Sequence, residues 1–299
     1  MTLDQAKGLR NIVKDHKAAR GESQMTSHKK NLPRVIAVTS GKGGVGKTNL
    51  VGNMAVALTR TGKRVAVIDA DVGLANIDII FNLRPQYNIR HVIQSEKTLK
   101  QVMVTSVHGV KILPGGSGFS DLAHLSDGEK LTLLSEFETL IDMADIILVD
   151  TGAGISANVL YFNSACDEVV VIATREPTSI TDAYAMMKVM SQEYGTKYFK
   201  LIVNMVESEK EAKKVYASLS AALDKFLKNV VLEYGGYIPM DRQLQLAVQK
   251  RSLVMDTSPD SVSSKAIHKI AQDLVNHPLR ENTNGNLTFF MNKVFQAVS

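Results

Sequence analysis

A glycine-rich loop directly after an apolar run constrains this chain more than any other feature of its sequence. Residues 41–48 read Gly-Lys-Gly-Gly-Val-Gly-Lys-Thr and follow the apolar run 35–38. The spacing G-x-x-x-x-G-K-[ST] between a strand and a helix is typical of a P-loop, because glycines let successive N–H groups turn inward around phosphate oxygens. The following helix adds its positive N-terminal end. The pattern predicts a nucleotide, with the Lys47 ammonium on the β- and γ-phosphates and the Thr48 hydroxyl on Mg²⁺. The residues expected to hold it are Gly41, Lys42, Gly43, Gly44, Val45, Gly46, Lys47 and Thr48.

Apolar strand-like runs recur along the chain, with helical patterns between most of them. Such alternation predicts an α/β fold, a mainly parallel sheet with helices on both faces and a ligand site at the carboxyl ends of its strands. The chain of 299 residues is long enough for one large domain of this kind or for two small ones. The expected strands are 35–39, 64–69, 109–113, 146–150, 168–174, 199–204 and 230–238, and the expected helices are 48–60, 155–165, 180–193 and 207–227.

Three aspartates stand at the ends of two of these strands. Asp69 and Asp71 end the run that begins at residue 64, and Asp150 follows four apolar residues that indicate a buried parallel strand. We expect the Asp150 carboxylate to hold Mg²⁺ through water. The glycines in 151–155 can approach a γ-phosphate through their backbone and move when it leaves. The alternative for Asp69 and Asp71 is a pair of acids that cap a turn.

An additional lysine, Lys42, occupies the second position of the loop, where cradling one nucleotide requires no cation. With this lysine the loop resembles the deviant P-loop of the MinD/ParA/nitrogenase-iron-protein ATPases, and residues 69–76 resemble the MinD-type switch I. The resemblance implies ATP or ADP with Mg²⁺ as cofactors, an ATP-sandwiched homodimer, and slow, dimer-dependent hydrolysis of ATP. It also implies that Lys42 reaches the partner's nucleotide, that Asp71 orients the attacking water and that Asp69 supports the metal shell. The alternative for Lys42 is a solvated side chain.

Two later segments match the family's contacts with the base. Asn204 ends the run 199–204, and Pro239 and Asp241 follow the run 230–238. In MinD relatives an Asn at that place hydrogen-bonds the base, and the segment 238–241 matches the second base-contact loop. By residue chemistry alone, each of the three is a turn residue.

The first 33 residues read as a helix on a tether. Residues 2–18 have the periodicity of an amphipathic helix, and 20–33 are polar and lack periodicity. Residues 4–10 match the D-Q-A-x-x-L-R motif of FlhG proteins, the flagellar MinD-type ATPases, and Asp-Thr-Gly-Ala-Gly at 150–154 is the variant of that branch. The resemblance implies that the helix stimulates the GTPase FlhF, and the alternative is a helix packed permanently on its own body. The residues expected to contact the partner are Asp4, Gln5, Leu9 and Arg10.

The last residues form an apolar helical face behind a turn-rich spacer at 282–286. The arrangement resembles the membrane-targeting helix of MinD and FlhG and predicts an anionic membrane surface as partner. Its single cation, Lys293, departs from the expected pattern, because each basic residue near such a surface adds ~1 kcal/mol. The alternative is a helix docked in a groove of its own subunit. The face consists of Leu287, Phe290, Met291, Val294 and Phe295.

Composition excludes several other classes. A single cysteine, Cys166, rules out disulfides within the chain and a cluster that needs two thiolates from each subunit. No run of 18 apolar residues predicts a transmembrane helix, and the polar N-terminus is not a signal peptide. Residues 1–34 carry an excess of five positive charges, equal to the net charge of the whole chain, so the neutral body makes no strong case for nucleic-acid binding.

These patterns predict three parts: a helix and linker at 1–33, an ATPase domain at 34–281 and a membrane-targeting helix at 282–299. The expected protein is cytoplasmic and peripheral on the inner face of the membrane. The resemblance to FlhG implies control of flagellar number or placement, with a second copy, FlhF and flagellar C-ring switch proteins as partners. Two alternatives stay open. One is a division-site or partition ATPase of MinD or ParA type, and the other is a non-catalytic, nucleotide-gated antagonist of a flagellar transcription activator.

Overall fold

The computed structural model describes residues 32–71, 76–115 and 126–277. The chain divides into two units, Met1–Asn31 and Leu32–Ser299, and every described residue belongs to the second. The residues expected to contact FlhF and the membrane fall in 1–31 and 278–299, so both predictions lie outside the described residues.

Within the described residues, eight strands form one sheet in the order β3-β4-β2-β5-β1-β6-β7-β8. Neighbouring strands are parallel, except that the short β3 pairs antiparallel with β4 at one edge. The predicted mainly parallel sheet is confirmed. The strands are β1 (Arg34–Ser40), β2 (Val65–Ala70), β3 (Val104–Thr105), β4 (Lys111–Leu113), β5 (Ile146–Ala153), β6 (Glu168–Ala173), β7 (Tyr198–Val206) and β8 (Val231–Pro239).

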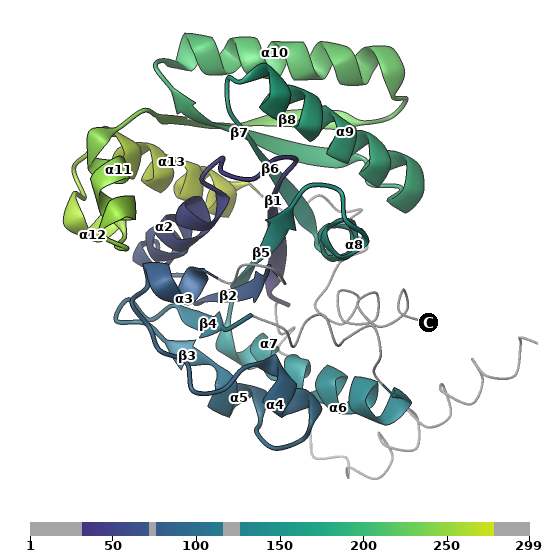
Figure 1. Ribbon diagram of the computed structural model, residues 1–299, viewed down its shortest axis with the longest axis vertical. Helices are drawn as coiled ribbons and strands as arrows, with labels where there is room; N and C mark the ends of the chain where they lie inside the picture. Colours follow the sequence, from purple (N-terminus) through teal and green to yellow (C-terminus); the bar gives the residue numbers. More distant parts are fainter. Residues whose placement is uncertain (1–31, 72–75, 116–125, 278–299) are drawn as a thin grey trace, which may run out of the picture. The chain divides into compact units, whose positions relative to one another are not determined.

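Helices cover both faces of this sheet (Figure 1). The face that carries Ile36, Val67 and Leu148 packs against α2 (Lys47–Arg60), α3 (Ile77–Ile80), α11 (Arg242–Gln249), α12 (Val254–Thr257) and α13 (Val262–Asn276). On the opposite face lie α4 (Ile89–Ile93), α5 (Leu99–Val102), α6 (Asp127–Glu138), α7 (Leu140–Met143), α8 (Ala157–Ala165), α9 (Pro177–Tyr194) and α10 (Glu209–Phe226). The helices expected at 48–60, 155–165, 180–193 and 207–227 correspond to α2, α8, α9 and α10, each within two or three residues at its ends.

Strand register brings two of the predicted aspartates together. Asp69 of β2 pairs with Asp150 of β5, and Asp150 also pairs with Val38 of β1. Residues in register on parallel strands point to the same face, here the face that α2 covers. Further down these strands that face is a closed apolar core, with side chains such as Val38, Val67 and Leu148 completely buried. The polar groups are therefore confined to the carboxyl ends of the strands, where α2 begins.

Candidate functional site

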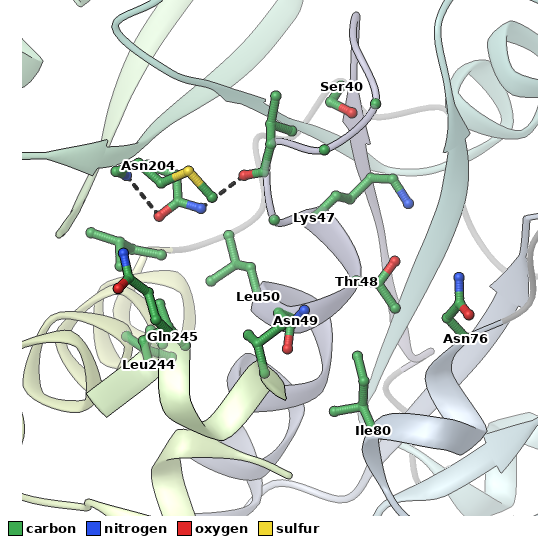
Figure 2. A pocket seen from close by; sticks show the side chains of 18 of the residues that line it. Ser40, Lys47, Thr48, Asn49, Leu50, Asn76, Ile80, Asn204, Leu244 and Gln245 are labelled. Atoms are coloured by element: carbon green, nitrogen blue, oxygen red, sulfur yellow. Dashed lines mark hydrogen bonds between the residues drawn. The ribbon is translucent and has the colours of Figure 1, made fainter. Parts of the chain in front are cut away.

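A cavity of about 910 Å³ lies at the carboxyl ends of the strands. The P-loop and the first turn of α2 form one wall, and the ends of β7 and β8 with α11 form another (Figure 2). Every P-loop residue from Gly43 to Thr48 lines this cavity, and so do Asp71, Asn204, Pro239 and Asp241. The structure therefore brings together residues that the sequence separates by almost 200 positions.

The P-loop backbone requires glycine at two positions for different reasons. Gly46 precedes α2 with φ of 85°, a left-handed conformation that side chains disfavour, and a Cβ there would lie 2.6 Å from the Asn204 amide nitrogen. At Gly41 a Cβ would lie 2.2 Å from the backbone carbonyl carbon of Asp182 in α9. The loop is thus held close against β7 on one side and α9 on the other.

The predicted phosphate lysine is buried and paired. The Lys47 ammonium lies 2.5 Å from Asp150 Oδ1, and the two side chains are 7% and 1% exposed. Burial raises the pKa of Asp150, and the Lys47 charge opposes that shift. The Lys47 side chain is therefore held at the base of the P-loop by a carboxylate from β5.

The same carboxylate offers an oxygen to a cation. Asp150 Oδ2 is buried and has no hydrogen-bond partner among the described residues. Oxygen ligands suit Mg²⁺, which is usually held by one or two protein side chains together with water and substrate phosphates. In the described residues, no group of three or more His, Cys, Asp or Glu side chains gathers into a metal site. Asp150, with the Thr48 hydroxyl on the adjacent cavity wall, fits the ion.

Asp69 also reaches the site, but its carboxylate has other partners. Its side chain is 1% exposed, with Oδ1 accepting the backbone N–H of Asp71 and Oδ2 that of Ile77, each at 3.2 Å. Burial raises the pKa of Asp69 to about 7, and the neighbouring Asp150 carboxylate adds to the shift. The supporting role of Asp69 at the metal stays a prediction. The bonds that the Asp69 carboxylate makes here are to the backbone.

Asp71, which the sequence predicts to orient the attacking water, lies at the cavity. It lines the cavity just beyond β2, and its Oδ1 is 3.7 Å from the position that a Cβ on Gly152 would take. The negative charge of Asp71 also contributes, as the weakest of several causes, to raising the pKa of Asp150. The carboxylate therefore faces Gly152 near the end of β5 and remains within electrostatic reach of the Lys47–Asp150 pair.

Lys42, unlike Lys47, is not part of the cavity lining. Its ammonium lies 2.7 Å from a carboxylate oxygen of Glu176 and 3.1 Å from the hydroxyl of Thr178, at the start of α9. Hydrogen bonding to Lys42 lowers the pKa of the Glu176 carboxyl. The lysine therefore stands at the rim of the loop, 38% exposed, with a carboxylate partner in its own chain.

Asn204, a predicted base contact, lines the cavity between β7 and the P-loop. Its Nδ2 donates to the Val45 carbonyl at 2.8 Å, and its Oδ1 accepts from the Met205 N–H at 2.9 Å (Figure 2). The two bonds fix which way the amide faces and tie β7 to the P-loop. An amide has two N–H donors and an oxygen with two lone pairs, so one donor and one acceptor site remain.

Pro239 and Asp241 also line the cavity, but Asp241 has structural bonds as well. Its Oδ1 accepts the Gln243 N–H at 2.8 Å as the N-cap of α11. Its Oδ2 accepts the backbone N–H and the hydroxyl of Ser263 at 3.1 and 2.7 Å. The carboxylate thus links the first turns of α11 and α13, a contact that residue spacing did not reveal.

Sequence reasoning missed several residues of the lining, among them Met205 and Leu244. Met205 has φ of 59°, and the register between β7 and β8 shifts between Asn204 and Val206. This bulge leaves Met205 41% exposed at the cavity. A bulge depends on how two strands pair, so the sequence carried no usable signal for it.

Comparison with known proteins agrees with this geometry. Residues 31–275 match the family described as "ParA: NUBPL iron-transfer P-loop NTPase". The chain is 41% identical to the antiactivator FleN of Pseudomonas aeruginosa over 88% of this chain and 94% of that protein. The chain belongs to the FleN/YlxH group of MinD/ParA P-loop ATPases. A second relative, the flagellum site-determining protein YlxH of Helicobacter pylori, is 37% identical over 82% of this chain and 83% of that protein.

Solved structures place the fold in the same family. The MinC:MinD cell division complex of Aquifex aeolicus matches with a TM-score of 0.65 and 27% identity, covering 83% of this chain and 98% of that one. Membership of the group confirms the resemblance on which the sequence analysis relied. Within the part of the chain that the structure describes, no helix is long and apolar enough to span a bilayer.

Proposed function

We propose that this chain is a MinD-type ATPase that dimerises with ATP and regulates the number or placement of flagella. The catalytic part depends on one observation, a P-loop lysine buried against Asp150, whose second oxygen is left without a partner. The cellular part is supported by its relatives, one called an antiactivator and the other a flagellum site-determining protein.

Adenine fits the base end better than guanine. Bonds to Val45 and Met205 determine which way the Asn204 amide is oriented. In that orientation one amide N–H and one oxygen lone pair remain available. Adenine presents an acceptor and a donor side by side, N7 and N6–H₂, which such an amide complements, whereas guanine presents two acceptors there. Asp241 already accepts bonds from Gln243 and Ser263, so the preference for adenine depends on Asn204 alone.

Phosphoryl transfer needs mainly positioning and charge neutralisation, and this chain's residues divide those tasks. The backbone N–H groups of the loop and the Lys47 ammonium would bind and orient the β- and γ-phosphates, and Asp71 would orient the attacking water. Thr48 and Asp150 would hold Mg²⁺, which when bound neutralises charge on the phosphate oxygens. Lys42 would contact the nucleotide of a second subunit once released from Glu176.

The decisive test is ATP turnover by the full chain, with GTP as the competing nucleotide. Lys47→Ala should lose nucleotide binding, because it removes the cation of the cradle. Asp71→Ala should bind ATP and stay dimeric but turn over slowly, since it removes water orientation and not affinity. Asp78→Asn, a nearby acid on α3 that is not in the cavity lining, is the matched control and should behave as the unaltered chain does. Native turnover by Asp71→Ala would move the orienting role to another residue.

The N-terminal and C-terminal segments carry the finer parts of the proposal. A peptide of residues 1–20 should accelerate GTP hydrolysis by FlhF, with Gln5 placed to position water and Arg10 to stabilise charge. Gln5→Ala or Arg10→Ala should weaken that acceleration and leave ATP hydrolysis by the body unchanged. If the peptide has no effect on FlhF, the activator role is removed.

A second candidate is a nucleotide-gated antagonist of a transcription activator that does not hydrolyse ATP. The name of the Pseudomonas relative, antiactivator, favours this alternative. ATP binding and dimerisation without measurable turnover, in the presence and absence of lipid, would select it over the ATPase.

A further inference from the structure

Asp69 makes an arrangement of bonds that neither nucleotide nor metal binding accounts for. It is the last residue but one of β2, and its carboxylate is almost fully buried. One oxygen accepts the N–H of Asp71, two residues on, and the other accepts the N–H of Ile77, eight residues on, the first residue of α3. A single side chain thus joins the two ends of the segment 71–77.

Neighbouring strands and Gly115 surround Asp69, the residue that makes these two bonds. β2 lies between β4 and β5; Asp69 pairs with Asp150 of β5, and the residue before it, Ile68, pairs with Leu113 of β4. Gly115, just beyond β4, closes the third side, since a Cβ there would lie 2.3 Å from the Asp69 carbonyl oxygen and 3.1 Å from its carboxyl carbon. A side chain at position 115 would therefore push against both the backbone and the carboxyl group of Asp69.

We propose that Asp69 is a positioning residue, whose carboxylate holds Asp71 and the start of α3 at a fixed distance and so places the Asp71 side chain for catalysis. The inference rests on the proposed function, because it assigns Asp69 a task in ATP hydrolysis. Two acceptor oxygens are needed to bind two N–H donors in this way, which a carboxylate supplies and an amide does not.

The hydrogen bonds of Asp69 and Asp150 also differ, which distinguishes a positioning role for Asp69 from the metal-binding role of Asp150. Both Asp69 oxygens accept backbone donors, whereas the adjacent Asp150 keeps one buried oxygen without a partner among the described residues. Of the two acids paired in register, Asp150 has the oxygen that no described residue occupies, and Asp69 is the one whose two oxygens both bind the chain.

The test compares Asp69→Asn with Asp78→Asn in the full chain. Asp78 is a matched control, since it also accepts a backbone N–H on α3, that of Ile79, without bridging to β2. Asp69→Asn should lower kcat by about tenfold to a hundredfold, the cost of a misplacement near 1 Å. It should leave the Kd for ATP within about twofold and leave the Mg²⁺ concentration for half-maximal rate unchanged. Asp78→Asn should change none of these.

Gly115→Ala gives a second, independent variant that leaves both oxygens of Asp69 in place. The added methyl displaces Asp69 and should reproduce the loss of kcat at unchanged Mg²⁺ dependence. Hydrogen exchange provides a readout besides activity: the Asp71 and Ile77 amides should exchange at least about tenfold faster in Asp69→Asn than in the unaltered chain.

Two results overturn the inference. Native kcat in Asp69→Asn excludes a positioning role, and a loss of rate that excess Mg²⁺ restores assigns Asp69 to the metal instead. Failure of the proposed ATPase function can be distinguished from failure of this inference. Even in a chain that does not hydrolyse ATP, exchange of the Asp71 and Ile77 amides still measures whether Asp69 holds them.

Discussion

At the scale of single residues, ion pairs decide which charges are available to a nucleotide. Lys47 and Lys42 belong to the same loop, yet one is buried against Asp150 and the other is half-exposed against Glu176. A surface pair of the second kind contributes little stability, because solvent screens it. Lys42 can therefore exchange partners at small cost, as a contact between subunits would require.

Lys42→Ala should keep ATP binding and lose ATP-induced dimers, because the variant retains the phosphate cradle and lacks the cation at its rim. Light scattering with ATP and with ADP measures the change. Lys213→Ala, which removes an exposed lysine that pairs within α10, is the control and should dimerise as the unaltered chain does. Persistent dimers of Lys42→Ala would refute the role between subunits.

A second residue-scale prediction concerns Asp167, which precedes β6 at the end of the sheet away from the cavity. Its Oδ2 accepts the Val35 N–H at 2.7 Å, and its Oδ1 is buried without a partner among the described residues. Burial raises the pKa of Asp167 from 3.8 to about 7. The folded state therefore binds this proton more tightly than the unfolded state, and stability falls as pH rises from about 4 to about 7.

Asp167→Asn should remove that dependence, because the amide stays neutral and its oxygen can still accept the Val35 N–H. The variant should gain stability relative to the unaltered chain by up to ~1.4 kcal/mol per pH unit in this range, with no further gain above pH 7. Urea unfolding at several pH values measures the difference. Asp69 titrates in both proteins, so its contribution cancels, and parallel pH profiles would contradict the prediction.

At the scale of elements, the site depends on how strands and helices are tied together at their ends. Asn204 ties β7 to the P-loop, Asp69 ties β2 to α3, and Asp241 ties α11 to α13. In each case a side chain at the end of a strand accepts or donates a bond to the backbone of another element. The cavity walls are thus fixed by polar contacts at the carboxyl edge and by the apolar core beneath them.

Asp241 allows the capping role to be separated from contact with the base. Asp241→Ala should destabilise the protein by about 1 to 2 kcal/mol, since it removes the N-cap of α11 and the bonds to Ser263. Asp241→Asn should restore only the N-cap part of that loss, because its single amide oxygen can accept the Gln243 N–H but its NH₂ group cannot accept the Ser263 N–H. Denaturant unfolding measures stability, and calorimetric titration measures ATP affinity. If Asp241→Asn is stable but binds ATP much more weakly, the carboxylate itself contacts the nucleotide.

At the scale of the whole molecule, the proposed cycle joins the nucleotide site to segments outside the described residues. A terminal helix with one cation binds an anionic surface weakly, and two such helices on one dimer raise the effective concentration of the second. Membrane binding should therefore depend on ATP even if the helix itself never contacts the nucleotide.

Removal of residues 286–299 should abolish sedimentation with anionic liposomes, and so should Phe290→Glu, which puts a charge on the apolar face. Gln296→Glu adds the same charge within the segment on the side opposite the predicted apolar face, and should retain more binding. ATP should be required in the unaltered chain. Equal binding with ADP would contradict avidity of a dimer as the cause.

Much of the fold and of the site could be predicted because it depends on local chemistry. Strands such as β1 and β5 are continuous apolar runs, and α2 begins where glycines give way to Lys47 and Thr48, so periodicity and loop composition are enough to locate them. A P-loop is a backbone conformation that needs glycine at particular positions, and a short continuous stretch of sequence is enough to recognise it.

Only the tertiary structure decided which polar groups are already bonded to other parts of the chain. Asp69 and Asp150 look alike in the sequence, each following an apolar strand, but packing commits both oxygens of the first to backbone N–H groups and leaves one oxygen of the second without a partner. Asn204 likewise bonds Val45, 159 positions away, and Asp241 bonds Ser263. A side chain's remaining hydrogen-bonding capacity depends on neighbours brought together by strand order, which residue patterns along the chain do not contain.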